Sequence, residues 1–175
     1  MRLPYLLSAT ALSLSLCLPA SATTFAFGAT LSNVGEPIPT STGTGFAGVD
    51  FDDALLQVSV NETFANLVSP ATAAHIHCCT TTAFTGSIGV ALGLTSFPSA
   101  QSGNYVNTFT LTAAAFNSLL AGSQAGKAYL NIHSAAHPGG EIRGFLVPVP
   151  EPETYALMMA GLGLVGLAAR RRRAA

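Results

Sequence analysis

The residues of this sequence best suited to chemistry are its histidines. His75 and His77 stand two apart in one short segment, and His133 and His137 lie in and just after another. Side chains two apart on a β-strand point to the same face, so His75 and His77 share one side of their strand. If the two segments are neighbouring strands, three imidazoles converge, and imidazole is a common ligand of copper and zinc. The spacing therefore predicts a Cu or Zn site formed by His75, His77 and His133.

The alternative is a structural role for the same side chains. Imidazoles can hydrogen-bond the backbone of loops or the carboxylate of Glu141, and so fix one end of the fold. His137, beside Pro138 in a glycine-rich turn, is expected to be exposed and is the weakest candidate ligand. Glu141 and Arg143 fall on one face of the last strand, where they could pair with each other or with a neighbouring strand. We expect an ion pair between them that holds the last strand in register.

Two adjacent cysteines, Cys78 and Cys79, follow directly after His77. In an oxidising compartment they are not expected both to remain free thiols. Three arrangements are open besides unpaired thiols: a disulfide between the two neighbours, disulfides to another chain, or thiolate ligands on a metal beside His77. Each places the two sulfur atoms differently relative to the histidines.

The elements that must position these residues are β-strands. Segments rich in Val, Ile, Phe and Thr alternate with Gly, Pro, Asn and Ser clusters at a spacing of roughly ten residues. This pattern predicts one all-β domain over 23–147, built from two packed antiparallel sheets. The expected strands are 24–31, 44–51, 54–61, 72–79, 87–92, 104–111, 127–133 and 141–147.

The alternation also predicts which side chains form the core, and where the strand series is interrupted. We expect Leu56, Val58, Val60, Leu130 and Ile132 to face the core. A single helix over 113–121 is expected to begin after a capping threonine at 112, to end at the glycine at 122, and to cover one end of the sandwich. The proline-containing segment 35–39 is expected to be a loop or an edge, because proline donates no ladder hydrogen bond.

Composition excludes several classes of protein. Of the 175 residues, 49% are hydrophobic and only 9% are charged, whereas ordinary soluble domains have about 25% charged residues. Between 23 and 147 there are two basic and six acidic residues, which excludes a nucleic-acid-binding surface. The high apolar content argues against intrinsic disorder. The sequence contains no nucleophile elbow, phosphate loop or Ser/His/Asp spacing, so we expect no enzyme activity.

The first 22 residues have the order of a secretory signal peptide. A basic residue is followed by an apolar run and then by Ala20, Ser21 and Ala22, the small residues at which signal peptidase cuts. Cleavage after Ala22 would remove Cys17 with the peptide. The expected partners of this segment are the Sec export machinery and signal peptidase.

The other end, 148–175, carries a second targeting pattern. An apolar stretch over 154–169 would span about 24 Å as a helix, short of the roughly 30 Å hydrocarbon core of a bilayer. This tail resembles the bacterial PEP-CTERM sorting signal, whose parts are a Pro-Glu-Pro motif, a short apolar helix and a basic cluster. The matching residues are Pro150, Glu151, Pro152, Arg170, Arg171, Arg172 and Arg173.

The resemblance implies a route to the cell surface. An exosortase would remove the tail near the Pro-Glu-Pro motif. The chain would be tethered to the inner membrane through its C-terminal helix before this step, and would be at the surface or extracellular after it. The alternative is a plain C-terminal anchor helix, with its arginines kept on the cytoplasmic side.

The middle of the chain resembles the CHRD domain, named for chordin. The resemblance rests on Ala-His-Ile-His at 74–77 and on Pro-Gly-Gly-Glu-Ile-Arg-Gly at 138–144, with supporting matches from residue 25 onward. It implies an extracellular β-sandwich of the immunoglobulin or superoxide-dismutase-like Greek-key sort, without an established reaction. The sequence departs from the family at Cys78 and Cys79, where the family usually continues with Gly.

Two functions follow as expectations. The first is an exported, non-enzymatic protein of the cell surface or extracellular matrix, which contributes to biofilm, floc or exopolysaccharide-associated structure. The second is a copper- or zinc-binding β-sandwich with redox or metal-scavenging activity.

Overall fold

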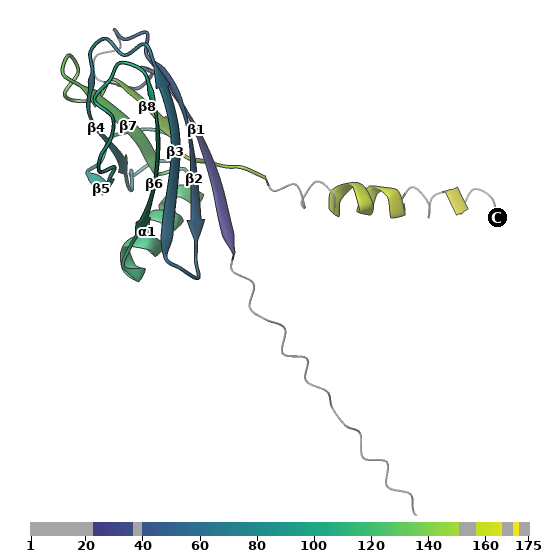
Figure 1. Cartoon of the computed structure of the whole chain (residues 1–175). Coiled ribbons are helices and arrows are strands. Elements are labelled where there is room, and N and C mark those ends of the chain that lie inside the picture. The colour runs from purple at the N-terminus through teal and green to yellow at the C-terminus, as the bar shows by residue number, and fades with distance from the viewer. Residues whose placement is uncertain (1–22, 37–39, 151–156, 166–169, 172–175) are drawn as a thin grey trace, which may run out of the picture.

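Strands with alternating buried and exposed side chains build two facing antiparallel sheets (Figure 1). The computed structural model describes residues 23–36, 40–150, 157–165 and 170–171. The expected signal peptide, 1–22, therefore lies outside the described residues. The expected all-β fold of two packed sheets is confirmed.

The first sheet has five strands in the order β6-β3-β2-β1-β9. β1 pairs with β2 along its whole length, β2 pairs with β3, and β3 pairs with β6, so each inner strand is hydrogen-bonded on both sides. The strands are β1 (Thr24–Leu31), β2 (Thr44–Asp52), β3 (Gln57–Ala65), β6 (Gly103–Thr110) and β9 (Val147–Pro148).

The second sheet has four strands in the order β5-β4-β7-β8. They are β5 (Val90–Gly93), β4 (Ala71–His77), β7 (Tyr129–Ser134) and β8 (Ile142–Phe145). β4 and β7 are direct neighbours, with His75 opposite Asn131 and His77 opposite Tyr129. The strands that carry the histidines are thus side by side, which is the condition that the predicted three-histidine site required.

The core fills the space between the two sheets. Val58, Val60, Leu130 and Ile132 are buried there as predicted. Leu56 also packs against the core, but it does so from the turn before β3, where its φ is 53°. Its expected place in a strand is therefore wrong. Other large side chains that are fully buried are Leu31, Phe51, Ile76, Phe116, Ile142 and Leu146.

One helix, α1 (Ala113–Gln124), closes one end of the sandwich, as expected (Figure 1). Thr112 is the N-cap, and its hydroxyl accepts a hydrogen bond from the backbone N–H of Ala115 at 3.3 Å. Gly122 does not end the helix. It is buried inside the last turn, and the chain leaves the helix at Gly126, whose φ of 66° suits a residue without a Cβ.

The last expected strand, 141–147, is divided between the two sheets. β8 pairs with β7, whereas β9 pairs with β1, where Gly28 faces Val147. The division follows from a close crossing of β1 and β8, since a Cβ at Gly144 would collide with the carbonyl of Thr30. Ser32 and Arg143 exchange two backbone hydrogen bonds at this crossing. The chain therefore passes from one sheet to the other instead of continuing as one strand.

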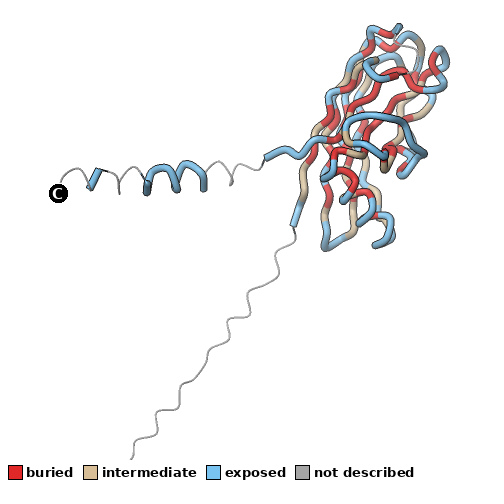
Figure 2. Tube along the Cα trace, turned by 180° about the vertical axis from the view of Figure 1, so that it is seen from behind, coloured by how far each residue is buried: buried red, intermediate tan, exposed pale blue. Residues whose placement is uncertain are grey.

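Smaller differences concern loops and the tail. The expected strand 54–61 begins at Gln57 in the structure, and the expected strand 87–92 begins at Val90. Gly35 and Glu36 lie in a loop, as expected, while 37–39 are outside the described residues. Residues 157–165 and 170–171 are helical and exposed (Figure 2). Within the described residues, no helix has the length and apolar character needed to cross a bilayer.

Candidate metal centre

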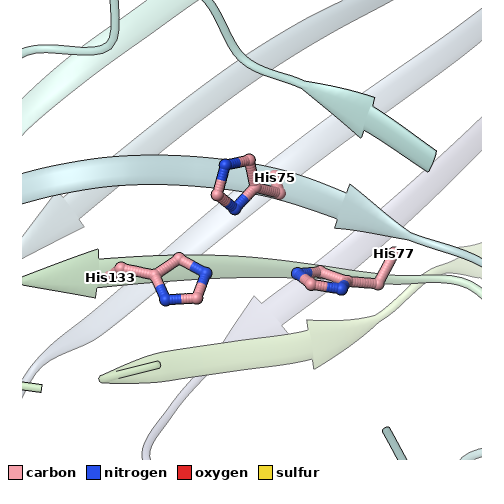
Figure 3. A group of neighbouring side chains, drawn as sticks. All are labelled: His75, His77 and His133. Carbon is pink, nitrogen blue, oxygen red and sulfur yellow. The ribbon is translucent and has the colours of Figure 1, made fainter. Parts of the chain in front are cut away.

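β4 and β7 bring three histidines together on the outer face of the four-stranded sheet. Ile76, Leu130 and Ile132 point into the core, so alternation turns His75, His77 and His133 to the opposite face. Figure 3 shows the three rings clustered above these two strands. One ligand nitrogen of each ring can be chosen so that all three lie within 4.8 Å of one another. The structure thus assembles the three residues that the sequence analysis named.

Hydrogen bonds fix which nitrogen of two rings is free. His77 Nδ1 lies 2.7 Å from the carbonyl oxygen of Ile88, and His133 Nδ1 lies 2.9 Å from that of Pro138. A carbonyl can only accept, so each Nδ1 carries the hydrogen and donates it, which leaves a lone pair on each Nε2. Backbone partners of this kind orient the imidazole ligands of metals.

One buried nitrogen of each clustered ring lacks a hydrogen-bond partner among the described residues. His77 Nε2, His133 Nε2 and His75 Nδ1 are buried, and none has a hydrogen-bond partner within the described part of the chain. Buried polar atoms are normally satisfied, because leaving one unpaired costs about 1–3 kcal/mol. Each of the three clustered rings therefore has an unpaired buried nitrogen, and imidazole nitrogens form a donor set suited to Cu or Zn.

The surroundings of His75 and His77 favour the neutral form of both rings. Burial lowers the pKa of His75, and the neighbouring His133 and His77 lower it further. Burial also lowers the pKa of His77, against the opposing effect of its hydrogen bond to Ile88. A neutral imidazole is the form that binds a metal ion, so no proton has to leave His75 or His77 at neutral pH.

Tyr129 supports the cluster from one side and was not singled out from the sequence. Its ring stacks parallel to that of His77, with 4.7 Å between centroids. Its hydroxyl accepts a hydrogen bond from the backbone N–H of Ile88 at 3.3 Å, so Ile88 anchors both rings. The guanidinium carbon of Arg143 lies 5.0 Å from the centre of the Tyr129 ring. Alternation along β7 puts Tyr129 on the face of His133, and this signal could have identified it.

Arg143 and Glu141 have separate partners, so the expected ion pair between them is wrong. Arg143 Nε lies 3.8 Å from Glu36 Oε1, which also accepts a hydrogen bond from Asn131 at 3.0 Å. Burial raises the pKa of Glu36 to about 7, and Arg143 opposes this rise. The reason for the separation is that Glu36 comes from the loop after β1, which the sequence could not place beside β8.

Glu141 belongs to a second buried cluster with His137. Its carboxylate accepts hydrogen bonds from Ser41 Oγ and from the backbone N–H of Val68, both at 2.6 Å, and lies 3.6 Å from His137 Nδ1. Although burial pushes the pKa of Glu141 up, these hydrogen bonds and one from Ser134 lower it overall. His137 is buried, so its expected exposure is wrong, and it is not part of the three-histidine cluster.

Cys78 and Cys79 are joined by a disulfide in the structure. Their sulfur atoms lie against α1, where a Cβ on Gly122 would collide with both of them. Within the described residues, the cluster that could hold a metal ion contains histidines alone. A disulfide between the two neighbours is the first of the arrangements considered from the sequence, and it places both sulfur atoms against the helix.

Comparison with known families adds to this geometry. Residues 27–146 match the CHRD domain, which covers more than half of the chain. The chain is a CHRD-domain protein. No curated protein and no solved structure matches it.

The region after the CHRD domain matches the PEP-CTERM protein-sorting motif over residues 148–173. The CHRD-domain protein is therefore an exported protein that is sorted by an exosortase. Pro150, Arg170 and Arg171 are exposed in the structure. The other residues expected in this motif lie outside the described residues, and they are Glu151, Pro152, Arg172 and Arg173.

Proposed function

We propose that this CHRD-domain protein is a non-enzymatic component of the cell surface or extracellular matrix, where it contributes to biofilm, floc or exopolysaccharide-associated structure. The observation that carries the proposal is where the sandwich ends relative to the sorting motif. The last backbone hydrogen bond of the five-stranded sheet runs from Val149 N–H to the carbonyl of Ala26 at 2.8 Å. Pro150 follows directly, so cleavage near the Pro-Glu-Pro motif leaves the sandwich whole.

The surface of the five-stranded sheet supports the same role. Thr30, Phe46, Thr63 and Asn104 face one another across β1, β2, β3 and β6, and all four are exposed. Hydroxyl and amide groups beside an exposed aromatic ring suit contact with a hydrated glycan. Neither the CHRD domain nor the sorting motif is an enzymatic family, which agrees with a structural role.

A deletion strain complemented with the full chain tests this proposal. We expect the deletion to reduce aggregation and surface-bound glycan, and the full chain to restore both. Complementation with a chain in which Arg170, Arg171, Arg172 and Arg173 are replaced by Ala is expected to fail, because the sorting signal is then incomplete. A protein that stays stably in the cytosol, or a deletion that leaves aggregation and surface composition unchanged, would refute the proposal.

The second candidate function is binding of copper or zinc for redox or metal-scavenging purposes. It is favoured by two observations on His75, His77 and His133. One ligand nitrogen of each ring lies within 4.8 Å of the other two, and each ring has a buried nitrogen without a hydrogen-bond partner in the described part of the chain. A bound ion would supply Lewis acidity or, with copper, one-electron chemistry. The backbone carbonyls of Ile88 and Pro138 hold two of the rings in position for it.

Elemental analysis of the exported full chain tests this candidate. We expect one equivalent of Cu or Zn in the native protein and none in the His75→Ala/His77→Ala variant. His137→Asn is the matched control, because His137 is buried in a different cluster, and it is expected to keep the metal. Visible copper absorption and superoxide turnover separate redox activity from scavenging. Full metal content in the double variant would refute the candidate.

A further inference from the structure

Among the described residues, the three-histidine cluster contains no group that could neutralise the charge of a bound ion. Within the described residues it consists of imidazoles alone, with neither a carboxylate nor a thiolate among the donors. The partners that hold His77 and His133 are backbone carbonyls, which carry no formal charge. A dication bound here would bring two uncompensated positive charges into a half-buried site, whereas a monocation would bring one.

The charged side chain nearest to His77 along a stack of rings is the positively charged Arg143. Arg143 lies over the Tyr129 ring at 5.0 Å, and that ring stacks on His77 at 4.7 Å. The guanidinium is itself held by Ser87 Oγ at 3.1 Å and by the carbonyl of Gly86 at 3.2 Å, so its position is fixed. Its counter-charge is Glu36, at 3.8 Å from Nε.

We infer that the three-histidine centre selects copper in its +1 state over Zn²⁺, and that Arg143, stacked on Tyr129, sets this selectivity. The inference rests on the metal-binding function proposed above and names the ion for it. Cu(I) can be held by two or three neutral imidazoles alone, whereas Zn²⁺ with the same three ligands takes a water or hydroxide as a fourth ligand. Repulsion by Arg143 acts twice as strongly on a dication as on a monocation. At a separation on the order of 10 Å and an effective dielectric constant of about 20, this extra repulsion corresponds to about a tenfold difference in affinity.

A substitution at Glu36 should change the selectivity in the direction opposite to a substitution at Arg143. Replacing Arg143 by Gln removes the positive charge, while replacing Glu36 by Gln removes the charge that offsets it. Arg143→Lys keeps the charge and is the matched control. The measurements belong at pH 8, where Glu36 is mostly ionised because its pKa is about 7.

The experiment measures the affinity of the exported full chain for each ion alone, under anaerobic conditions. Cu(I) is supplied against a competing Cu(I) chelator, and Zn²⁺ against a zinc chelator. We expect the native protein to bind Cu(I) at least about tenfold more tightly than Zn²⁺, which is the difference that repulsion by Arg143 supplies. Arg143→Gln should lower the ratio of Cu(I) affinity to Zn²⁺ affinity about tenfold, and Glu36→Gln should raise it. Arg143→Lys should leave this ratio near the native value.

The outcomes separate this inference from the proposal on which it rests. A native protein that binds neither ion refutes the metal-binding function and the inference with it. Equal affinity for both ions, or a ratio that is unchanged in both Arg143→Gln and Glu36→Gln, refutes the inference and leaves the metal centre standing. If Arg143→Gln does not fold, Glu36→Gln decides, because it changes the side chain least and predicts a shift in the other direction.

Discussion

His77 is held more firmly than the other two clustered imidazoles. Its Nδ1 donates to the carbonyl of Ile88, and the ring of Tyr129 lies parallel against one face. Tyr129 contacts the same backbone unit through its hydroxyl, so one short segment of loop fixes both rings. The direction of the free Nε2 therefore depends on Tyr129 as much as on His77 itself.

Loss of the Tyr129 ring should weaken metal binding. We expect Tyr129→Leu to reduce affinity for Cu or Zn about 10- to 100-fold, as is usual when the support of a metal ligand is removed. Tyr129→Phe keeps the stacked ring and loses only the hydroxyl contacts, so its affinity should lie close to that of the native protein. Chelator competition measures both. Equal affinities for the leucine and native proteins would show that the stack does not position His77.

Glu62 lies in the core, and its ionisation makes the stability of the fold depend on pH. It is fully buried on β3, and neither carboxylate oxygen has a hydrogen-bond partner within the described part of the chain. Burial raises its pKa from 4.5 to about 8. The folded state therefore binds the Glu62 proton more tightly than the unfolded state does.

The sign of the pH dependence follows from this difference. Below pH 4.5 both states are protonated, and between pH 4.5 and about 8 the unfolded state loses the proton first, so stability falls as pH rises. The loss of stability between these pH values is at most about 5 kcal/mol.

We expect Glu62→Gln to remove most of this pH-dependent loss of stability, as measured by urea unfolding at pH 5 and pH 9. Glu36→Gln is the comparison, because Glu36 contributes in the same direction but only up to a pKa of about 7. An unchanged pH dependence in Glu62→Gln would refute the assignment.

At the scale of elements, the end of β4 and the last turn of α1 are fitted to each other. Gly122 is buried, and the Cys78–Cys79 disulfide occupies the space that a side chain there would need. Glycine inside a helix ordinarily costs about 1 kcal/mol relative to alanine. Its presence in α1 is explained by the close approach of the two sulfur atoms.

This contact reverses the usual effect of a helix substitution. We expect Gly122→Ala to destabilise the domain by about 1–3 kcal/mol through overpacking, although alanine is the better helix former. Asn117→Ala, at an exposed position of the same helix, should instead leave stability unchanged or raise it slightly. Thermal unfolding of the oxidised proteins compares them. A stabilised Gly122→Ala would mean that the sulfur atoms do not pack against the helix.

Much of the fold could be predicted because strand alternation is a local property. The period of two correctly placed Val58, Val60, Leu130 and Ile132 in the core, and it turned the clustered histidines outward. The partners that come from distant loops could not be predicted. Glu36 beside Arg143 and Ser41 beside Glu141 join residues about 100 positions apart, and no local pattern records such pairs. The sequence likewise could not show that Gly122 leaves room for the disulfide. A glycine near the end of a predicted helix is equally expected where the helix stops.

At the scale of the whole molecule, the three-histidine cluster and the sorting tail are attached to different sheets. The histidines lie on β4 and β7 of the four-stranded sheet, while the tail leaves from β9 at the edge of the five-stranded sheet. β9 is held by β1, with Phe27 opposite Pro148 and Gly28 opposite Val147. Removal of the tail beyond Val149 therefore breaks no backbone hydrogen bond of either sheet.

The last prediction concerns this junction. We expect the Pro150→Ala/Pro152→Ala chain to remain uncleaved, because the Pro-Glu-Pro motif that the exosortase recognises is lost, and to stay in the membrane fraction at the mass that includes the tail. Pro148→Ala is the matched control. Pro148 lies in β9 and outside the three motif residues, so this variant should be processed like the native chain. Cell fractionation with intact-mass measurement reads out both. Release of the double variant at the shortened native mass would show that processing does not depend on this motif, and would leave the apolar helix and the arginine cluster as the determinants of sorting.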